Sequence, residues 1–196
     1  MHKRWPRVLS LLVLALFLAA GCEFEEGILR RFAGERLGLI LETEPYTYER
    51  SLETRLINHI SRRFELQVIN PKLLMDASTY SNRMLEDYCR DELGLDYLLT
   101  IKLTDIIVNE PRPTLELEPG RVAVEVTSSC SLTLIYTLKD LAMDQILYFG
   151  QSNGASKLTN RVKAGEGGIR LDLNEFDPYK LVEDAMFNAL RNSDLL

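Results

Sequence analysis

The pattern of apolar and polar positions begins with a strand, a helix and a second strand. Residues 36–42, RLGLILE, are apolar enough for a largely buried strand. Residues 48–63 repeat apolar side chains at helical spacing, and residues 65–70, ELQVIN, alternate as a strand that Pro71 ends. This order predicts a βαβ unit.

A second helix is predicted over residues 81–93, with Gly94 as its C-terminal stop. Residues 95–108 then alternate strictly between apolar and polar side chains, which indicates a half-buried strand. The residues that follow predict a break in the chain, because they include Pro111, Pro113, Pro119 and Gly120.

Two further strands complete an expected antiparallel meander. Residues 121–138 alternate again, residues 140–144 predict a turn, and residues 145–151 predict the returning strand. Residues 152–176 are rich in glycine and polar side chains, and we expect an exposed hairpin or loop there.

The closing helix has a clear start signal, with Asp177 as N-cap and Pro178 at the first helical position. One stripe of apolar side chains follows at helical spacing and predicts that the helix covers a sheet face: Leu181, Val182, Ala185, Met186, Ala189 and Leu190. The predicted fold class is therefore α/β (α+β), a single domain over residues 36–196 with a mixed sheet and helices packed on it.

The first 21 residues have the layout of a bacterial signal peptide. A basic head with Lys3, Arg4 and Arg7 precedes 13 uncharged, largely apolar residues from Val8 to Ala20. A membrane-spanning helix needs about 20 such residues. We therefore expect residues 1–21 to be a signal peptide and not a transmembrane anchor.

The residues Ala19-Ala20-Gly21-Cys22 resemble the bacterial lipobox, in which the cysteine is acylated and becomes the mature N-terminus. A secreted chain cut near the same place is the alternative. The residue after Cys22 is Glu23 and not the aspartate typical of inner-membrane retention, so the resemblance implies an outer-membrane lipoprotein that faces the periplasm.

Residues 22–35 would form the lipid anchor and a short tether. Phe24, Ile28 and Phe32 recur every four residues and predict a short amphipathic helix. This helix would pack on a partner, on the lipid surface or on its own domain. The tether spans at most about 45 Å if extended, so the domain should stay near its membrane.

The charge of the chain argues against two kinds of partner. The formal net charge is −6, and removing residues 1–21 leaves 20 Lys and Arg against 29 Asp and Glu. A chain of this sign should be repelled by phosphate backbones and anionic head groups, so we expect no nucleic-acid partner. Docking is expected through the lipid or through protein.

Two other cysteines accompany Cys22. Cys89 falls on the apolar face of the predicted helix 81–93, and Cys130 shares strand parity with Leu132 and Leu134. Both side chains should point inward, either as buried free thiols or as a disulfide between helix and sheet.

The residues that usually carry catalysis are scarce. Gly150-Gln151-Ser152-Asn153-Gly154 matches G-x-S-x-G, but no convincing helix follows it, and the histidine of the mature chain, His59, comes earlier. We expect His59 at a helix rim.

The remaining glycine-rich stretch also lacks a binding signature. Gly165 to Gly168 lacks the Lys-Ser/Thr and the helix start of a phosphate loop. One histidine and two inward cysteines assemble no metal site at known spacing. The expectations are no enzyme, no cofactor, no metal and no small-molecule substrate.

Three phrases carry a family resemblance: RLINHISRRFELQVINPKLL, CRDELGLDYLLTIKLTDI and YTLKDLAMDQILYFGQS. Together with the order of elements over residues 36–151 and the last helix, they resemble the periplasmic domain of the curli secretion channel CsgG and its relatives. These relatives include the export lipoprotein PelC, the penicillin-binding-protein activator LpoB and the N-terminal domain of TolB.

The resemblance implies a non-enzymatic scaffold or export accessory of an envelope machine, assembled as a ring of identical subunits or as part of a larger complex. A short tether is more similar to PelC than to LpoB. The alternatives are a monomeric adaptor or activator of an envelope enzyme and an auxiliary lipoprotein of a lipid transporter. The segments 24–32 and 152–176 are the candidates for partner contacts.

Overall fold

The computed structural model describes residues 27–44, 49–74, 82–118, 121–165 and 168–196. The predicted signal peptide, the acylation site Cys22 and Phe24 lie outside the described residues. Within these residues, no helix is both long enough and apolar enough to cross a membrane.

Six strands form one mixed sheet in the order β2-β1-β3-β4-β5-β6. β1 pairs in parallel with both β2 and β3, and the pairs from β3 to β6 are antiparallel. The strands are β1 (Arg36–Thr43), β2 (Gln67–Ile69), β3 (Tyr97–Glu118), β4 (Arg121–Asp140), β5 (Gln145–Gly165) and β6 (Gly168–Asp172).

The predicted fold class is confirmed. β1, α2 (Glu49–Phe64) and β2 form the βαβ start, and β3, β4 and β5 form the antiparallel meander. A single helical turn, α3 (Pro71–Leu74), follows β2. The helix predicted over residues 81–93 is present as α4 (Asn82–Asp91).

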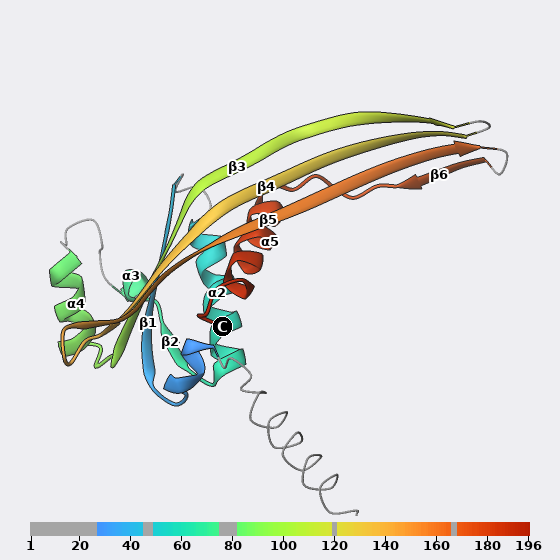
Figure 1. The fold of residues 1–196 in the computed structure, drawn as a ribbon. Helices are drawn as coiled ribbons and strands as arrows, with labels where there is room; N and C mark the ends of the chain where they lie inside the picture. The colour runs from blue at the N-terminus through green and yellow to red at the C-terminus, as the bar shows by residue number, and fades with distance from the viewer. Residues whose placement is uncertain (1–26, 45–48, 75–81, 119–120, 166–167) are drawn as a thin grey trace, which may run out of the picture.

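Helices cover both faces of the sheet's lower part, called the body here (Figure 1). α2 and α5 (Pro178–Arg191) lie on one face together with the 3-10 helix η1 (Ile28–Phe32), and α4 lies against the other. Asp177 caps α5 by accepting a hydrogen bond from the Tyr179 N–H, with Pro178 inside the first turn, as predicted. The whole predicted stripe of α5 is buried.

The larger core lies between the sheet and the helices α2 and α5. Alternate residues of the central strands supply it, because side chains of a strand alternate between its two faces: Leu37, Leu39 and Leu41 from β1, Leu99, Ile101 and Leu103 from β3, and Leu132, Leu134, Tyr136 and Leu138 from β4. A smaller core under α4 contains Cys89, Ile40 and Leu98.

The two ends of the described chain meet at the foot of the body. The Ile28 N–H donates to the Asp194 carbonyl at 2.9 Å, and the Leu29 N–H donates to the Leu195 carbonyl at 3.1 Å. A Cβ on Gly27 would lie 1.8 Å from the Leu196 carbonyl carbon, so only glycine fits there. Leu29 is fully buried, which attaches η1 to the domain.

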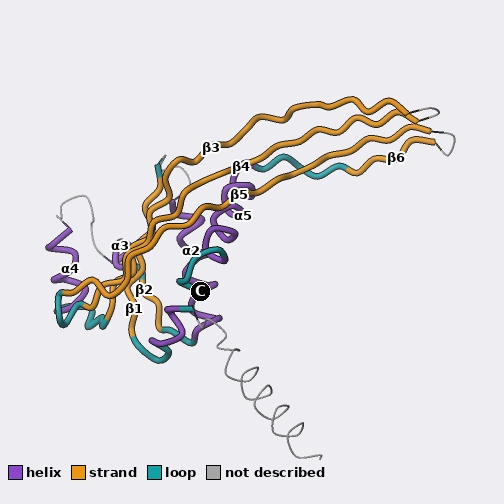
Figure 2. The backbone as a smooth tube through the Cα atoms, in the orientation of Figure 1, coloured by secondary structure: helices purple, strands orange, loops and turns teal. Residues whose placement is uncertain are grey.

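β3, β4 and β5 continue far beyond the helices and form, with β6, a long curved arm (Figures 1 and 2). The predicted break at Pro111 and Pro113 is wrong, because both residues lie inside β3. The pairing of β1 with β3 ends at Leu103, so the outer part of β3 is an edge strand among the described residues. An edge strand tolerates proline because one side of its backbone needs no donor.

Candidate interaction site: a four-stranded arm

We call residues 107–118, 121–131, 155–165 and 168–172 the arm. It starts where β3 loses β1 as its neighbour, just beyond Leu103. An irregularity in the pairing with β4 falls there, between Thr104 and Ile107, and Asp105 adopts a φ of +51°. Such bulges bend a strand and change its direction. This bulge directly follows Leu103, where the pairing of β3 with β1 ends.

The pairing register aligns side chains of the four arm strands in rows. One row is Leu117, Val122, Ala164 and Ile169, and the next row is Leu115, Val124, Val162 and Leu171. Both rows are apolar and lie on the same face, because successive rows of one parity share a face. In β4 this parity is the one that carries Leu132 and Leu134 into the core.

This apolar face is left uncovered by the domain. Leu117 and Ile169 expose 70% and 74% of their surface, and Leu115 and Leu171 expose 60% and 62%. None of the eight side chains of the two rows belongs to the described hydrophobic clusters. A contiguous exposed apolar patch of this kind is typical of an interaction surface.

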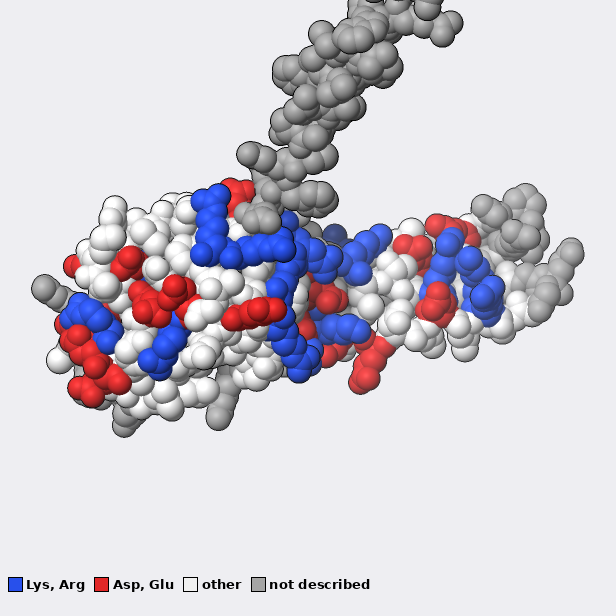
Figure 3. Space-filling model, turned by 90° about the horizontal axis from the view of Figure 1, so that it is seen from below, with Lys and Arg blue, Asp and Glu red and all other residues white. Residues whose placement is uncertain are grey.

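The opposite face of the arm is charged and internally paired. Arg161 forms an ion pair with Glu116 and lies 3.9 Å from Glu125, and all three side chains come from neighbouring strands. The same face carries Lys163 and Arg170 in the row of Glu116. Figure 3 shows basic and acidic side chains side by side on the arm. The arm is therefore amphipathic.

The edge of β5 in the body is closed by α5. The Asn188 side-chain amide donates to the Ala155 carbonyl at 2.7 Å, and that of Asn192 donates to the Asn153 carbonyl at 3.1 Å. Asn188 and Asn192 are four residues apart on α5, a rise of about 6 Å, and their acceptors are two residues apart on β5, a rise of about 6.6 Å. The two side chains can therefore donate to alternate carbonyls along the edge of β5. A paired edge cannot recruit another strand.

The edges of the arm have no such cover. The outer part of β3 pairs with β4 alone, and β6 pairs with β5 alone, among the described strands. Exposed edge strands present unpaired backbone donors and acceptors and are ready to pair with another chain. The molecule therefore protects the edge of β5 and leaves both edges of the arm open.

The G-x-S-x-G sequence lies inside β5 and forms no nucleophile turn. A Cβ on Gly154 would lie 2.0 Å from the Ala185 carbonyl oxygen, and one on Gly150 would lie 2.4 Å from the Tyr136 ring. The Ser152 hydroxyl donates to the Ala189 carbonyl at 2.8 Å. Gly154 and Ser152 therefore serve the packing of α5 on the sheet, and Gly150 makes room for the Tyr136 ring of β4.

His59 sits at the rim of α2, as predicted, and its ring packs 5.0 Å from that of Phe187. Partial burial, together with the positive charges of Arg63 and Arg191, lowers its pKa. Among the described residues no hydrogen bond or ion pair joins its ring to a carboxylate, and the contact with Phe187 makes it a packing residue.

Cys89 and Cys130 are both buried and unpaired, which fits the prediction of free thiols and not of a disulfide. Burial raises the pKa of each thiol to about 11, with the charge of Glu86 contributing at Cys89. The two residues lie in different cores, on opposite faces of the sheet.

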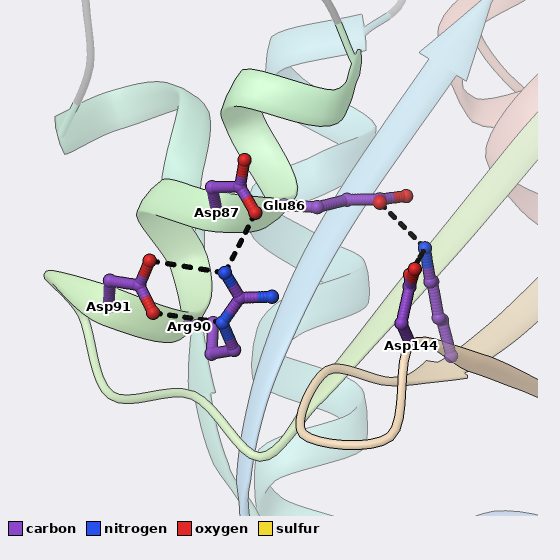
Figure 4. A network of polar contacts seen from close by, with 6 residues as sticks. Glu86, Asp87, Arg90, Asp91 and Asp144 are labelled. Carbon is purple, nitrogen blue, oxygen red and sulfur yellow. Dashed lines mark hydrogen bonds and ion pairs between the residues drawn. The ribbon is translucent and has the colours of Figure 1, made fainter.

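An ionic network fastens α4 to the turn between β4 and β5. The Lys139 ammonium lies 2.6 Å from Glu86 and 2.5 Å from Asp144, while Arg90 pairs with Asp87 and Asp91 within α4 (Figure 4). Hydrogen bonds to Asp144 and Glu86 raise the pKa of Lys139. The arrangement is a structural clamp, since every charge faces a partner.

Open depressions on the described part of the chain include two that are lined mostly by polar side chains. One, of about 980 Å³, lies between the starts of α2 and α5, and the other, of about 630 Å³, lies beside Asp105 and Arg191. Across the described ranges, no three His, Cys, Asp or Glu side chains come together in a metal-binding group.

The structure describes only part of each of the two segments predicted to contact a partner, residues 24–32 and 152–176. Residues 28–32 form η1, which packs on the domain through Leu29 and through Phe32, whose ring lies 4.7 Å from that of Tyr97. Residues 152–165 belong to β5 and residues 168–172 to β6, with 166 and 167 outside the described residues.

No protein-family model matches the sequence, and no curated protein matches it. Solved structures with a similar fold include the LpoB C-terminal domain from Salmonella enterica, at 11% identity and a TM-score of 0.38, covering 62% of this chain and 82% of that one. The lipoprotein GNA1162 from Neisseria meningitidis matches at 11% identity and a TM-score of 0.36, covering 81% and 99%.

The PelC dodecamer from Paraburkholderia phytofirmans matches at 14% identity and a TM-score of 0.34, covering 84% of this chain and 90% of that one. LpoB and PelC are two of the relatives that the sequence resemblance named. Identities and TM-scores of this size carry no functional argument.

Proposed function

We propose that this protein is a non-enzymatic outer-membrane lipoprotein, anchored through Cys22 and facing the periplasm, whose copies assemble side by side through their arms as a ring-like scaffold of an envelope export machine. The observation that carries the proposal is the amphipathic arm with two open edges. The lipobox-like sequence before Cys22 supports the anchor.

The arm supports association because its apolar face has no cover within the chain. Burying exposed leucine and isoleucine side chains gains about 1.5–3 kcal/mol each. Leu115, Leu117, Ile169 and Leu171 are each at least 60% exposed. Such a surface in water favours a permanent partner.

The directions of the edge strands favour copies that point the same way. β3 runs from the body to the tip, and β6 runs from the tip toward the body. Pairing β3 of one copy with β6 of the next therefore joins two antiparallel strands while both arms point in one direction. This contact uses two different edges, and such heterologous contacts close into rings when the rotation permits.

The lengths of the two edges match. Proline cannot donate to a ladder, so beyond Pro113 the uninterrupted part of β3 is residues 114–118. β6 has the same length, residues 168–172. Continuing the existing rows across the junction would place Arg170 opposite the Glu116 of the next copy and Leu171 opposite its Leu115. Opposite charges and apolar pairs both stabilise cross-strand contacts.

The first test is the size of the natural protein in mild detergent, measured by light scattering or native mass spectrometry. The scaffold requires one discrete oligomer. A monomer overturns it and favours the adaptor of an envelope enzyme. Mass spectrometry of the N-terminus tests the anchor separately, because an unmodified N-terminus contradicts acylation at Cys22.

The second test asks whether the arms form the contact. In a variant with Leu115→Cys and Leu171→Cys, the two cysteines of one chain would be three strand spacings apart, about 14 Å, which is too far for a disulfide. Oxidation should therefore give a ladder of linked chains in denaturing gels. Cys89 and Cys130 are buried and should not contribute.

The matched control moves one cysteine by a single residue. In a Thr114→Cys and Leu171→Cys variant the two side chains lie on opposite faces of the sheet, so no ladder should form. A discrete oligomer without a Leu115–Leu171 ladder would preserve the scaffold and reject the arm as its contact.

A further inference from the structure

Five arginines gather at the foot of the body, where the described chain begins. They come from the last turns of three helices: Arg30 and Arg31 of η1, Arg62 and Arg63 of α2, and Arg191 of α5. We call this group the arginine end. Figure 3 views the molecule from this side and shows Lys and Arg side chains gathered in one region of the body.

α2 and α5 run in the same direction and end together. Arg55 pairs with Glu183 at 2.8 Å, His59 packs on Phe187, and the charges of Arg63 and Arg191 both act on His59. Each step advances four residues along both helices, so the two axes are parallel. Arg62, Arg63 and Arg191 therefore reach solvent at the same end, where all three are exposed.

Helix ends explain part of this arrangement. The last turn of a helix carries about half a negative charge, which favours a basic side chain. The arginine end exceeds this need, because α2 places two arginines in its last turn. Among the described residues, no ion pair occupies Arg62, Arg63 or Arg191. Burial first, and then the positive charges of Arg63 and Arg191, lower the pKa of His59 beside them.

The proposed anchor would bring this end to the membrane. Gly27 is held against Leu196, so the chain enters the domain beside the arginine end. Cys22 and Gly27 are five positions apart in the sequence, and this stretch spans at most about 17 Å when extended. Screening in physiological salt extends about 8 Å, so a domain held this closely comes within reach of the head groups.

Acidic residues occur at the same end. Glu35, Glu65 and Asp194 lie on the segments that follow the three helices, and Glu23, Glu25 and Glu26 lie between Cys22 and Gly27. Arg62, Arg63 and Arg191 are exposed and form no ion pair among the described residues, so the ends of α2 and α5 are the part of this end that can bind an anionic group. A guanidinium suits this role, because its planar fork binds phosphate oxygens in pairs.

We infer that the arginine end binds anionic phosphate head groups of the membrane to which the protein is anchored, and so sets the direction in which the arm points. The inference rests on the proposed lipid anchor. It assigns a local lipid contact to the exposed arginines of a chain whose total charge is negative, because charges farther away than the screening length contribute little to a contact at this end. The occupant is a lipid surface and not a protein.

The experiment removes the anchor so that the arginines act alone. The mature chain from residue 22 with Cys22→Ser is mixed with vesicles of neutral phosphatidylcholine, or of phosphatidylcholine with about one-third phosphatidylglycerol. We expect sedimentation with the anionic vesicles only, weakened as salt rises. Equal binding to both vesicles, or to neither, overturns the inference.

A charge reversal then locates the contact. Arg62→Glu with Arg63→Glu should weaken binding to the anionic vesicles at least about thirtyfold, from the usual contribution of two basic residues near such a surface. Lys157→Glu with Lys180→Glu changes the net charge equally, away from the arginine end, and should change binding less than about threefold. If both variants lose the same amount of binding to the anionic vesicles, the binding depends on the total charge of the chain and the assigned surface is rejected. Acylation is judged by mass spectrometry of the natural protein, so failure of the anchor and failure of the lipid contact are distinguishable.

Discussion

Gly154 of β5 lies directly against the backbone of α5, where a Cβ at residue 154 would come within 2.0 Å of the Ala185 carbonyl oxygen. Backbone cannot move aside as a flexible side chain does, so Gly154→Ala should force α5 away from the sheet. We expect a loss of at least about 2 kcal/mol in the free energy of unfolding. Lys157→Ala, exposed on the same strand, is the control and should leave the urea midpoint nearly unchanged.

The edge of β5 depends on two asparagine amides. Asn188→Ala with Asn192→Ala should leave the carbonyls of Ala155 and Asn153 without their protein donors, at a cost of about 1–2 kcal/mol. The opened edge should also raise concentration-dependent association, measured by light scattering of the unlipidated chain. Asp184→Ala, on the exposed side of the same helix, should do neither. Equal light scattering from the double asparagine variant and from the Asp184→Ala control would contradict the role of the amides.

His59 makes the stability depend on pH in a defined direction. Its pKa is lowered in the folded protein, first by burial and then by Arg63 and Arg191, so the unfolded chain binds the proton more readily. The stability that depends on neutral His59 is therefore fully present above the unfolded pKa of about 6.5. It is lost as the pH falls from there through the lower pKa of the folded protein. Unfolding by urea at a series of pH values should show this slope, and His59→Gln should reduce it between pH 6.5 and 5.

The ion pairs of Lys139 should contribute less to the free energy of unfolding than their short distances suggest. Its side chain is 18% exposed and Asp144 is 77% exposed, so water screens part of the interaction. Lys139→Gln should cost about 1 kcal/mol, and a double-mutant cycle with Glu86→Gln should give a coupling of about 0.5–1 kcal/mol. A coupling near zero would show that Glu86 does not hold α4 to the turn.

Cys89 and Cys130 should resist thiol reagents in the native protein. Burial raises the pKa of both to about 11, so almost no thiolate is present at pH 8. We expect no reaction of the folded mature chain carrying Cys22→Ser with Ellman's reagent, and two reacting thiols after unfolding in guanidinium chloride. A fast reaction before unfolding would place one of the thiols at the surface.

Local patterns in the sequence were sufficient for the body of the fold. The apolar run of β1, the alternation of β4, the cap at Asp177 and the apolar stripe of α5 depend on neighbours in the chain, and each has the predicted form. The same patterns predicted inward cysteines and a rim position for His59. Acylation of Cys22, and the roles built on it, remain predictions.

The exposed hairpin predicted within residues 152–176 is formed by β5 and β6, but the share of β3 and β4 in the candidate site was missed, because long-range pairing overrides local signals there. Prolines in β3 and glycines in β5 favour turns locally, but an edge strand accepts the prolines, and packing against α5 explains Gly154. Alternation at Leu115 and Leu117 and at Ile169 and Leu171 was the available signal for the arm, although it spans few residues on each strand.

The sequence by itself therefore determined the strands and helices of the body and which of their faces are apolar, since these properties depend on side chains a few positions apart. Only the tertiary structure decided that four strands extend past their covering helices and align their apolar rows. It also decided that α5 closes one edge while two edges stay open. These outcomes depend on hydrogen bonds and contacts between residues far apart in the chain, for which no local pattern carries the register.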